Sequence, residues 1–177
     1  MLALLALLLC APSAGQLLDL RDGTLTYTVV HKLHEVHGTT HEVEGRALAQ
    51  PDGTVKVQVR AKVASFDSGN SNRDEHMREA THEATHPYAE VKGTLVGVTL
   101  PLRAPAQAVL HAVIELNGEK ENEDVPVQLE PSEGGVRARF TFSISLDALK
   151  IERPQLLLVK VDDRATISGD LRFGAAK

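Results

Sequence analysis

The chain has 177 residues, of which 42% are hydrophobic and 24% are charged, which suits one globular domain with a sizeable core and argues against two large domains. The formal net charge is −5 and the basic residues are scattered, which excludes a clustered phosphate-binding surface and therefore nucleic acid as a partner. With four phenylalanines, two tyrosines and no tryptophan, an apolar interior has to be mainly aliphatic, and such a lining suits a flexible aliphatic guest.

The N-terminus has the features of an export signal. Residues 2–9 form an unbroken apolar stretch, far shorter than the roughly 20 residues that a membrane-spanning helix needs. Small residues ending at Gly15 follow it, as at a signal-peptide cleavage site. We therefore predict a signal peptide at residues 1–15 and a mature domain at residues 16–177. No later stretch approaches spanning length, so we expect an exported protein without a transmembrane segment.

Cys10 leaves a second interpretation of the N-terminus open. It is the one cysteine in the chain, so an intramolecular disulfide is excluded. As the first residue of a mature lipoprotein it would carry the lipid anchor. Leu9 stands where such signals usually have a small residue, so simple cleavage is the preferred prediction.

Most of the chain after the signal alternates apolar and polar residues with a period of two. Such alternation predicts strands with one buried and one solvated face, since a helix cannot use it. Turn residues such as Asn117-Gly118 separate the runs, and short connections favour antiparallel neighbours. These features predict an all-β protein, either two stacked sheets or a closed barrel. The alternation is clear at 55–63, 136–146 and 165–173 and weaker at 25–31, 36–48, 89–98, 108–116 and 125–129, while 156–161 is continuously apolar.

One segment, beginning at Ser71, breaks the period of two. It opens with helix-capping residues, has acidic residues in its first turn, and places Met77 and Ala80 three residues apart. Pro87 disfavours helical geometry in the residue before it, so we predict a short helix from Ser71 to about Thr85. Its thin apolar stripe suits a lid over one end of the barrel.

Within that segment, His82-Glu83-Ala84-Thr85-His86 matches the H-E-x-x-H signature of zinc hydrolases. In that signature a helix presents two imidazoles to zinc and the glutamate activates water. His86 directly precedes Pro87, at a helix end, and no third ligand is evident in the sequence. A zinc-dependent hydrolase using His82, Glu83 and His86 is therefore an alternative hypothesis only.

A second group of histidines comprises His31, His34, His37 and His41. Residues on one face of a strand repeat about 7 Å apart, so His31 and His37 could share a metal ion only across a bend or with a partner strand. A histidine-mediated metal-binding envelope protein is a further alternative. The preferred interpretation is a set of surface histidines, with no resident metal or cofactor.

The segment from Val63 to Met77, which contains Arg73-Asp74-Glu75-His76-Met77, resembles the signature region of YceI-like proteins. Similarity extends over about residues 20–174. This resemblance implies an extended eight-stranded antiparallel barrel, lipocalin-like, with one short α-helix between strands. It also implies a periplasmic location and a hydrophobic tunnel for a polyisoprenoid or a similar amphiphile, bound without catalysis.

Strand parity indicates which side chains face such a tunnel. We predict a non-enzymatic protein that carries or sequesters an isoprenoid or other long-chain amphiphile, and we leave a homodimer open. The same apolar side chains could instead fill the barrel as a solid core. The predicted ligand-binding residues are Tyr27, Val29, Val57, Val59, Phe140, Phe142, Ile144 and Ile167 in strands, with Phe66 and Met77 near the helical lid.

Overall fold

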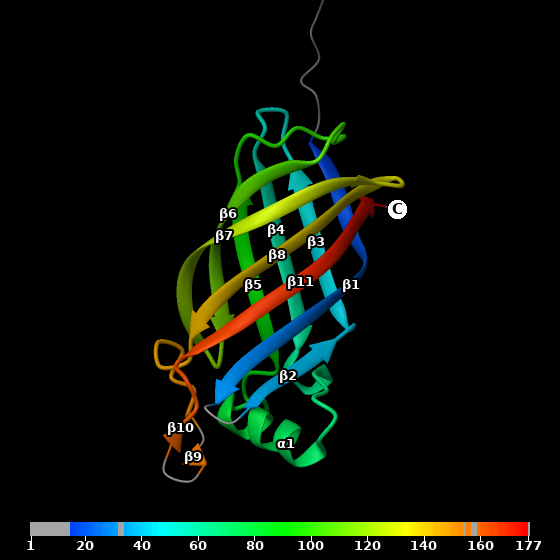
Figure 1. Ribbon diagram of the computed structural model, residues 1–177. Coiled ribbons are helices and arrows are strands. Elements are labelled where there is room, and N and C mark those ends of the chain that lie inside the picture. Colours follow the sequence, from blue (N-terminus) through cyan, green and yellow to red (C-terminus); the bar gives the residue numbers. More distant parts are fainter. Residues whose placement is uncertain (1–14, 32–33, 154, 157–158, 177) are drawn as a thin grey trace, which may run out of the picture.

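The computed structural model describes residues 15–31, 34–153, 155–156 and 159–176, so the predicted signal peptide and Cys10 lie outside the described residues. Within these residues, none of the helices combines the length and the apolar character that crossing a membrane requires. The strands are β1 Gln16–His31, β2 His34–Thr40, β3 Val43–Ala49, β4 Val55–Lys62, β5 Tyr88–Leu95, β6 Ala106–Leu116, β7 Glu119–Ser132, β8 Gly135–Ser145, β9 Gln155–Leu156, β10 Val159–Lys160 and β11 Arg164–Ala175, and the helices are η1 Val63–Ser65 and α1 Ser71–Ala80 (Figure 1).

Eight of these strands close into an antiparallel barrel. The order runs β11-β8-β7-β6-β5-β4-β3-β1, and β1 pairs with β11 to complete the ring. An additional strand, β2, pairs with β1 outside the ring, while β9 and β10 form a separate small hairpin. The all-β prediction and the eight-stranded barrel are confirmed, and closure decides between a barrel and a stacked sandwich.

Strand β1 is longer than the alternation indicated because a bulge interrupts its parity. Its register against β11 shifts between Leu20 and Asp22. Before the bulge the inward-facing residues have even numbers, as in Leu18 and Leu20. After it they have odd numbers, as in Leu25 and Tyr27, because the extra residue shifts the alternation by one position. The sequence prediction began only at Leu25 for this reason.

Strands β2 and β3 are two halves of one bent strand. Both pair with β1 in the same register, β2 against its second half and β3 against its first four residues. The bend falls at His41–Glu42, where the hydroxyl of Thr40 accepts a hydrogen bond from the Glu42 amide at 3.0 Å. Beyond the bend, β3 pairs with β4, whereas β2 leaves the ring. The single strand predicted for residues 36–48 is therefore divided.

Helix α1 lies across the lower end of the barrel in Figure 1, as predicted, but it ends at Ala80 and not near Thr85. Asn70 caps its start by accepting a hydrogen bond from the Arg73 amide at 3.1 Å. At its end the Thr81 hydroxyl donates to the Met77 carbonyl, and His82 adopts a left-handed backbone with φ of 48°. Proline therefore does not set the end of the helix, because this local cap stops it earlier.

The interior contains two groups of buried side chains. The larger, which we call the main core, centres on residues such as Val59, Leu110 and Val127 along the barrel. The smaller, the helix-end core, comprises Ile114, Ile144, Leu146, Leu149, Ile151 and Ala165. Leu146, Leu149 and Ile151 come from the connection that follows β8 and close that end of the barrel from within.

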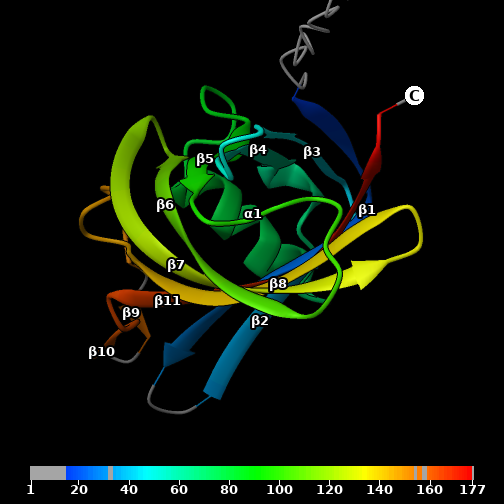
Figure 2. The ribbon, with the colours of Figure 1, turned by 90° about the horizontal axis from the view of Figure 1, so that it is seen from above.

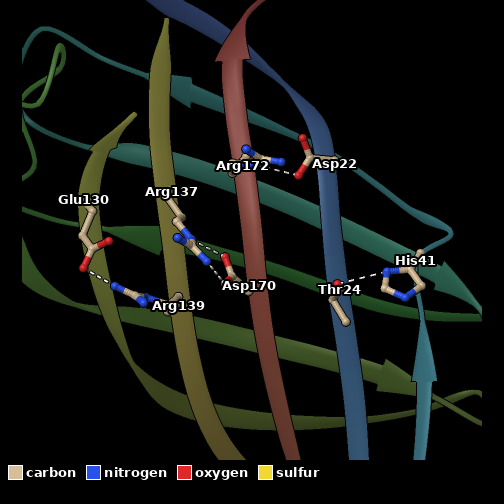
Figure 3. Close-up of polar contacts among 8 residues, drawn as sticks. All are labelled: Asp22, Thr24, His41, Glu130, Arg137, Arg139, Asp170 and Arg172. Carbon is tan, nitrogen blue, oxygen red and sulfur yellow. Dashed lines mark hydrogen bonds and ion pairs between the residues drawn. The ribbon is translucent and has the colours of Figure 1, made fainter. Parts of the chain in front are cut away.

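Ion pairs cross the outer face of the strands on either side of the closing β11–β1 contact (Figure 3). The Arg172 Nε donates to the Asp22 carboxylate at 2.7 Å across that contact. On the neighbouring strands Arg137 holds Asp170 through two hydrogen bonds, one of them 2.7 Å long, and Arg139 binds Glu130. These cross-strand pairs favour the observed register of β7, β8, β11 and β1.

Asp170 is expected to make the barrel acid-sensitive. Hydrogen bonds from Arg137 are the main cause that lowers the pKa of Asp170 below its ordinary 3.8. Because the folded pKa is lowered, the stabilisation is complete above the unfolded pKa and is lost as the pH falls through the folded value. Asp170→Asn should therefore lower the melting temperature by a few degrees at pH 7 and by less near pH 2.

Thermal unfolding of both proteins, followed by circular dichroism across that pH range, checks this expectation. Glu133→Gln, in the exposed turn between β7 and β8, removes the same charge and serves as the control. A difference between wild type and Asp170→Asn that is the same at both pH values would contradict it.

Candidate ligand-binding cavity

The barrel encloses a cavity of about 150 Å³ that runs between its two ends. All eight strands of the ring contribute to the wall, together with Phe66 near α1 and with Val98 and Leu100 from the connection between β5 and β6. Apart from Tyr27, Arg60 and Glu90, the residues of the wall are apolar. An apolar cavity of this size stays dry and accepts hydrocarbon, because water finds no polar partners in it.

The few aromatic residues of the chain are concentrated in this wall. All four phenylalanines and Tyr27 line the cavity. The rings of Tyr27 and Phe66 lie with centroids 5.6 Å apart, and those of Phe140 and Phe142 lie 6.0 Å apart. Both pairs are tilted, an arrangement that rings favour over a face-to-face stack.

Two glycines give these rings their space. Gly38 is the register partner of Tyr27, and a Cβ atom placed on it would lie 2.3 Å from the tyrosine ring. Gly169 is the partner of Phe140, and a Cβ there would lie 2.2 Å from the phenylalanine ring. Each ring therefore lies against bare backbone of the neighbouring strand at these two places in the cavity wall.

The structure brings most of the predicted ligand-binding residues to the cavity. Val29 packs against the helix-end core, and Met77 is half-buried in α1, so neither lines the cavity. Sequence reasoning did not select Leu18 or Phe173, which also line it, although alternation marks Phe173 as inward-facing. The predicted residues that line the cavity are Tyr27, Val57, Val59, Phe66, Phe140, Phe142, Ile144 and Ile167.

The Arg73-Asp74 pair fixes the chain just before α1. The buried Asp74 carboxylate accepts a hydrogen bond from the Ser68 amide at 3.1 Å, and Arg73 donates to the Ser68 carbonyl at 2.9 Å.

Burial is the main cause that raises the pKa of Tyr27, and the nearby Asp74 carboxylate raises it further while Arg73 partly offsets this. The Tyr27 hydroxyl therefore stays neutral at physiological pH.

The histidines of the H-E-x-x-H sequence have a structural arrangement that does not favour the zinc hydrolase alternative. Because α1 ends at Ala80, His82 and His86 are not presented from one helical face. The His82 Nδ1 lies 2.7 Å from the Asn117 side-chain oxygen, and His86 lies against Gly118. Across residues 15–31, 34–153, 155–156 and 159–176, the acidic, histidine and cysteine side chains form no cluster of three or more that could hold a metal ion.

The second group of histidines lies along the outside of β1 and β2. The Nδ1 atoms of His37 and His41 pair with the hydroxyls of Thr28 and Thr24, at 2.8 Å and 3.1 Å respectively (Figure 3 for His41). The side chain of His31 lies outside the described part of the chain. These contacts match the preferred interpretation of surface histidines held by neighbouring hydroxyls.

The fold and the cavity together define the class of protein, which is a closed antiparallel eight-stranded β-barrel built around an apolar interior. The model of the YceI-like domain matches residues 17–173, and the chain therefore belongs to the YceI-like family. A search of curated proteins gives no match.

Solved structures share the fold at low sequence identity. A polyisoprenoid binding domain from Saccharophagus degradans, implicated in plant cell wall breakdown, is 17% identical, with a TM-score of 0.72 over 90% of this chain and 98% of that one. BcnA of Burkholderia cenocepacia is 15% identical, with a TM-score of 0.71 over 85% of this chain and 95% of that one. A mutant CJ YCEI protein is 13% identical, with a TM-score of 0.60 over 84% and 89%.

Proposed function

We propose that this protein binds one linear apolar molecule, a polyisoprenoid or a similar amphiphilic lipid, inside the barrel and carries or sequesters it without chemical change. The observation that carries the proposal is the enclosed cavity with its almost wholly apolar wall. A guest of this kind needs no directional chemistry, since burial of each methylene contributes about 0.8 kcal/mol. Export to the periplasm by the predicted signal peptide would place the protein where envelope lipids are handled.

The family supports the choice of guest. The Saccharophagus degradans structure is described as a polyisoprenoid binding domain, and the two chains share the barrel over nearly their whole lengths. The cavity supports it independently, because its aliphatic and phenyl side chains match the branched hydrocarbon of a prenyl chain. Within the wall, Tyr27 offers a hydroxyl group near α1, and apart from Arg60 and Glu90 the other residues offer apolar contact.

The cavity volume sets the length of chain that fits. An engineered apolar cavity of about 150 Å³ binds one benzene molecule, so this cavity accommodates a group of about six carbon atoms without rearrangement. This corresponds to about one isoprene unit. A longer guest has to displace side chains or extend out of the barrel.

The first experiment measures affinity along two series, straight-chain fatty acids and the prenyl alcohols geraniol, farnesol and geranylgeraniol. Each added methylene should lower the dissociation constant by about fourfold until the cavity is full, and then the affinity should level off. Competition against cis-parinaric acid, a linear fluorescent polyene acid, gives these constants. An affinity that does not depend on chain length would contradict binding inside the barrel.

The second experiment identifies the native guest. Organic extraction of the purified protein, followed by mass spectrometry, should release a long-chain lipid in stoichiometric amount. Ribonuclease A, which has no lipid-binding site, carried through the same cell lysate and extraction controls for lipid that any protein surface collects. Recovery of no lipid from the protein together with failure to take up any member of either series would refute the proposal.

A further inference from the structure

The two ends of the cavity are closed by different kinds of structure. At the helix end the wall includes Phe66 and Leu116, next to α1 and the helix-end core. At the other end it includes Val98 and Leu100, from the segment 96–105 that joins β5 to β6. Figure 2, which looks down on this second end, shows that segment crossing the mouth of the barrel. A guest has to pass one end or the other.

The helix end is closed by a buried, hydrogen-bonded plug. Leu149 is fully buried, and its backbone carbonyl and that of Lys150 both accept hydrogen bonds from the Asn117 amide nitrogen, at 3.0 Å and 3.1 Å. The Asn117 oxygen in turn pairs with His82 of the turn after α1. Asn117 thus joins three separate segments at one buried point, and opening this end would leave buried polar groups without partners.

The opposite end is closed by a segment that fewer contacts hold in place. Within residues 96–105, all of which the structure describes, one hydrogen bond reaches another part of the chain, from the Val98 amide to the Gly53 carbonyl at 3.0 Å. Leu100 and Leu102 are only half-buried against the main core, and Val96 is 65% exposed. Opening this end breaks one backbone hydrogen bond and exposes Leu100 and Leu102, which already contact solvent, together with the buried side chain of Val98. Within this segment no buried polar side chain loses a partner.

We infer that the guest enters and leaves through the end covered by segment 96–105, with Leu100 and Leu102 as the gate, while the Asn117 plug keeps the helix end shut. This inference rests on the proposed function. It also gives His82 of the H-E-x-x-H sequence a role, because His82 pairs with Asn117 in the plug. The apolar tail of the guest enters first and stops against the helix-end core.

The test compares rates of cis-parinaric acid uptake and release by stopped-flow fluorescence in matched variants. Leu102→Ala loosens the gate at a residue that packs against the main core without lining the cavity. It should raise the association and dissociation rates by about tenfold each, with little change in the dissociation constant. Asn117→Gly loosens the plug, keeps a residue that tolerates the φ of 57°, and should leave both rates unchanged.

The outcomes separate the inference from the proposed function. Faster exchange in Asn117→Gly, or equal acceleration in both variants, would overturn the assignment of the gate while leaving lipid binding intact. A wild-type protein that takes up no probe would overturn the proposed function and the gate with it. Circular dichroism confirms folding of each variant, and His82→Asn replaces Asn117→Gly as the plug variant if the latter does not fold.

Discussion

Replacing Ala138 with phenylalanine is expected to abolish guest binding while leaving the barrel as stable as before. Ala138 lines the cavity from the first half of β8 and packs against the main core. A phenyl ring there would fill most of a cavity that accommodates about one benzene-sized group. The guest would lose contact for about five methylenes, or about 4 kcal/mol, which raises the dissociation constant by about a thousandfold.

Stability should respond in a different way, because the ring fills a void instead of displacing packed atoms. The free energy of unfolding should stay the same or rise by about 1 kcal/mol. Ala138→Leu fills less of the cavity and should give an intermediate loss of affinity, about 2 kcal/mol. Parinaric acid titration gives the affinities, and urea unfolding gives the free energies.

Thr141→Phe supplies the matched control. Thr141 lies on the same strand with its side chain exposed on the outer face, so the same ring is added outside the cavity. Affinity should not change in this variant. Retention of wild-type affinity by Ala138→Phe would mean that the guest binds somewhere other than the barrel interior.

The sequence predicts the strands where alternation is uninterrupted, and fails where the chain changes parity or leaves the sheet. The run at 55–63 became β4 with the expected inward face, apart from its last residue, Val63, which starts η1. The first half of β1 was missed because the bulge after Leu20 reverses the alternation. The bend at His41–Glu42 depends on where β3 meets β4, which is a tertiary contact that no local pattern contains.

The cavity is harder to predict than the fold because it depends on residues that face one another from separate strands. Alternation marks Tyr27 and Phe140 as inward-facing, but the glycines beneath their rings are identified only once the register is known. Leu100 and Leu149 lie in connections without periodicity, so nothing in the sequence indicated that they close the two ends. A filled barrel and a hollow one therefore share the same pattern.

The effect of Gly169→Ala on the free energy of unfolding is expected to change sign when Phe140 is replaced by alanine, as measured in a double-mutant cycle. In the wild-type protein, Gly169→Ala places a Cβ 2.2 Å from the Phe140 ring and should lower the free energy of unfolding by about 1–3 kcal/mol. In a Phe140→Ala background the ring is gone. Alanine then has less conformational freedom to lose than glycine, so the same change should be neutral or stabilise by about 0.5 kcal/mol.

Urea unfolding of the four proteins in the cycle gives a coupling energy, which we expect to be about 1–3 kcal/mol. Gly38→Ala against Tyr27 provides an independent copy of the same arrangement, with the Cβ 2.3 Å from the tyrosine ring. If Gly169→Ala destabilises equally in both backgrounds, the backbone and not the ring limits this position. The Phe140 ring would then not require glycine at position 169, because it could move away from the added methyl group without strain.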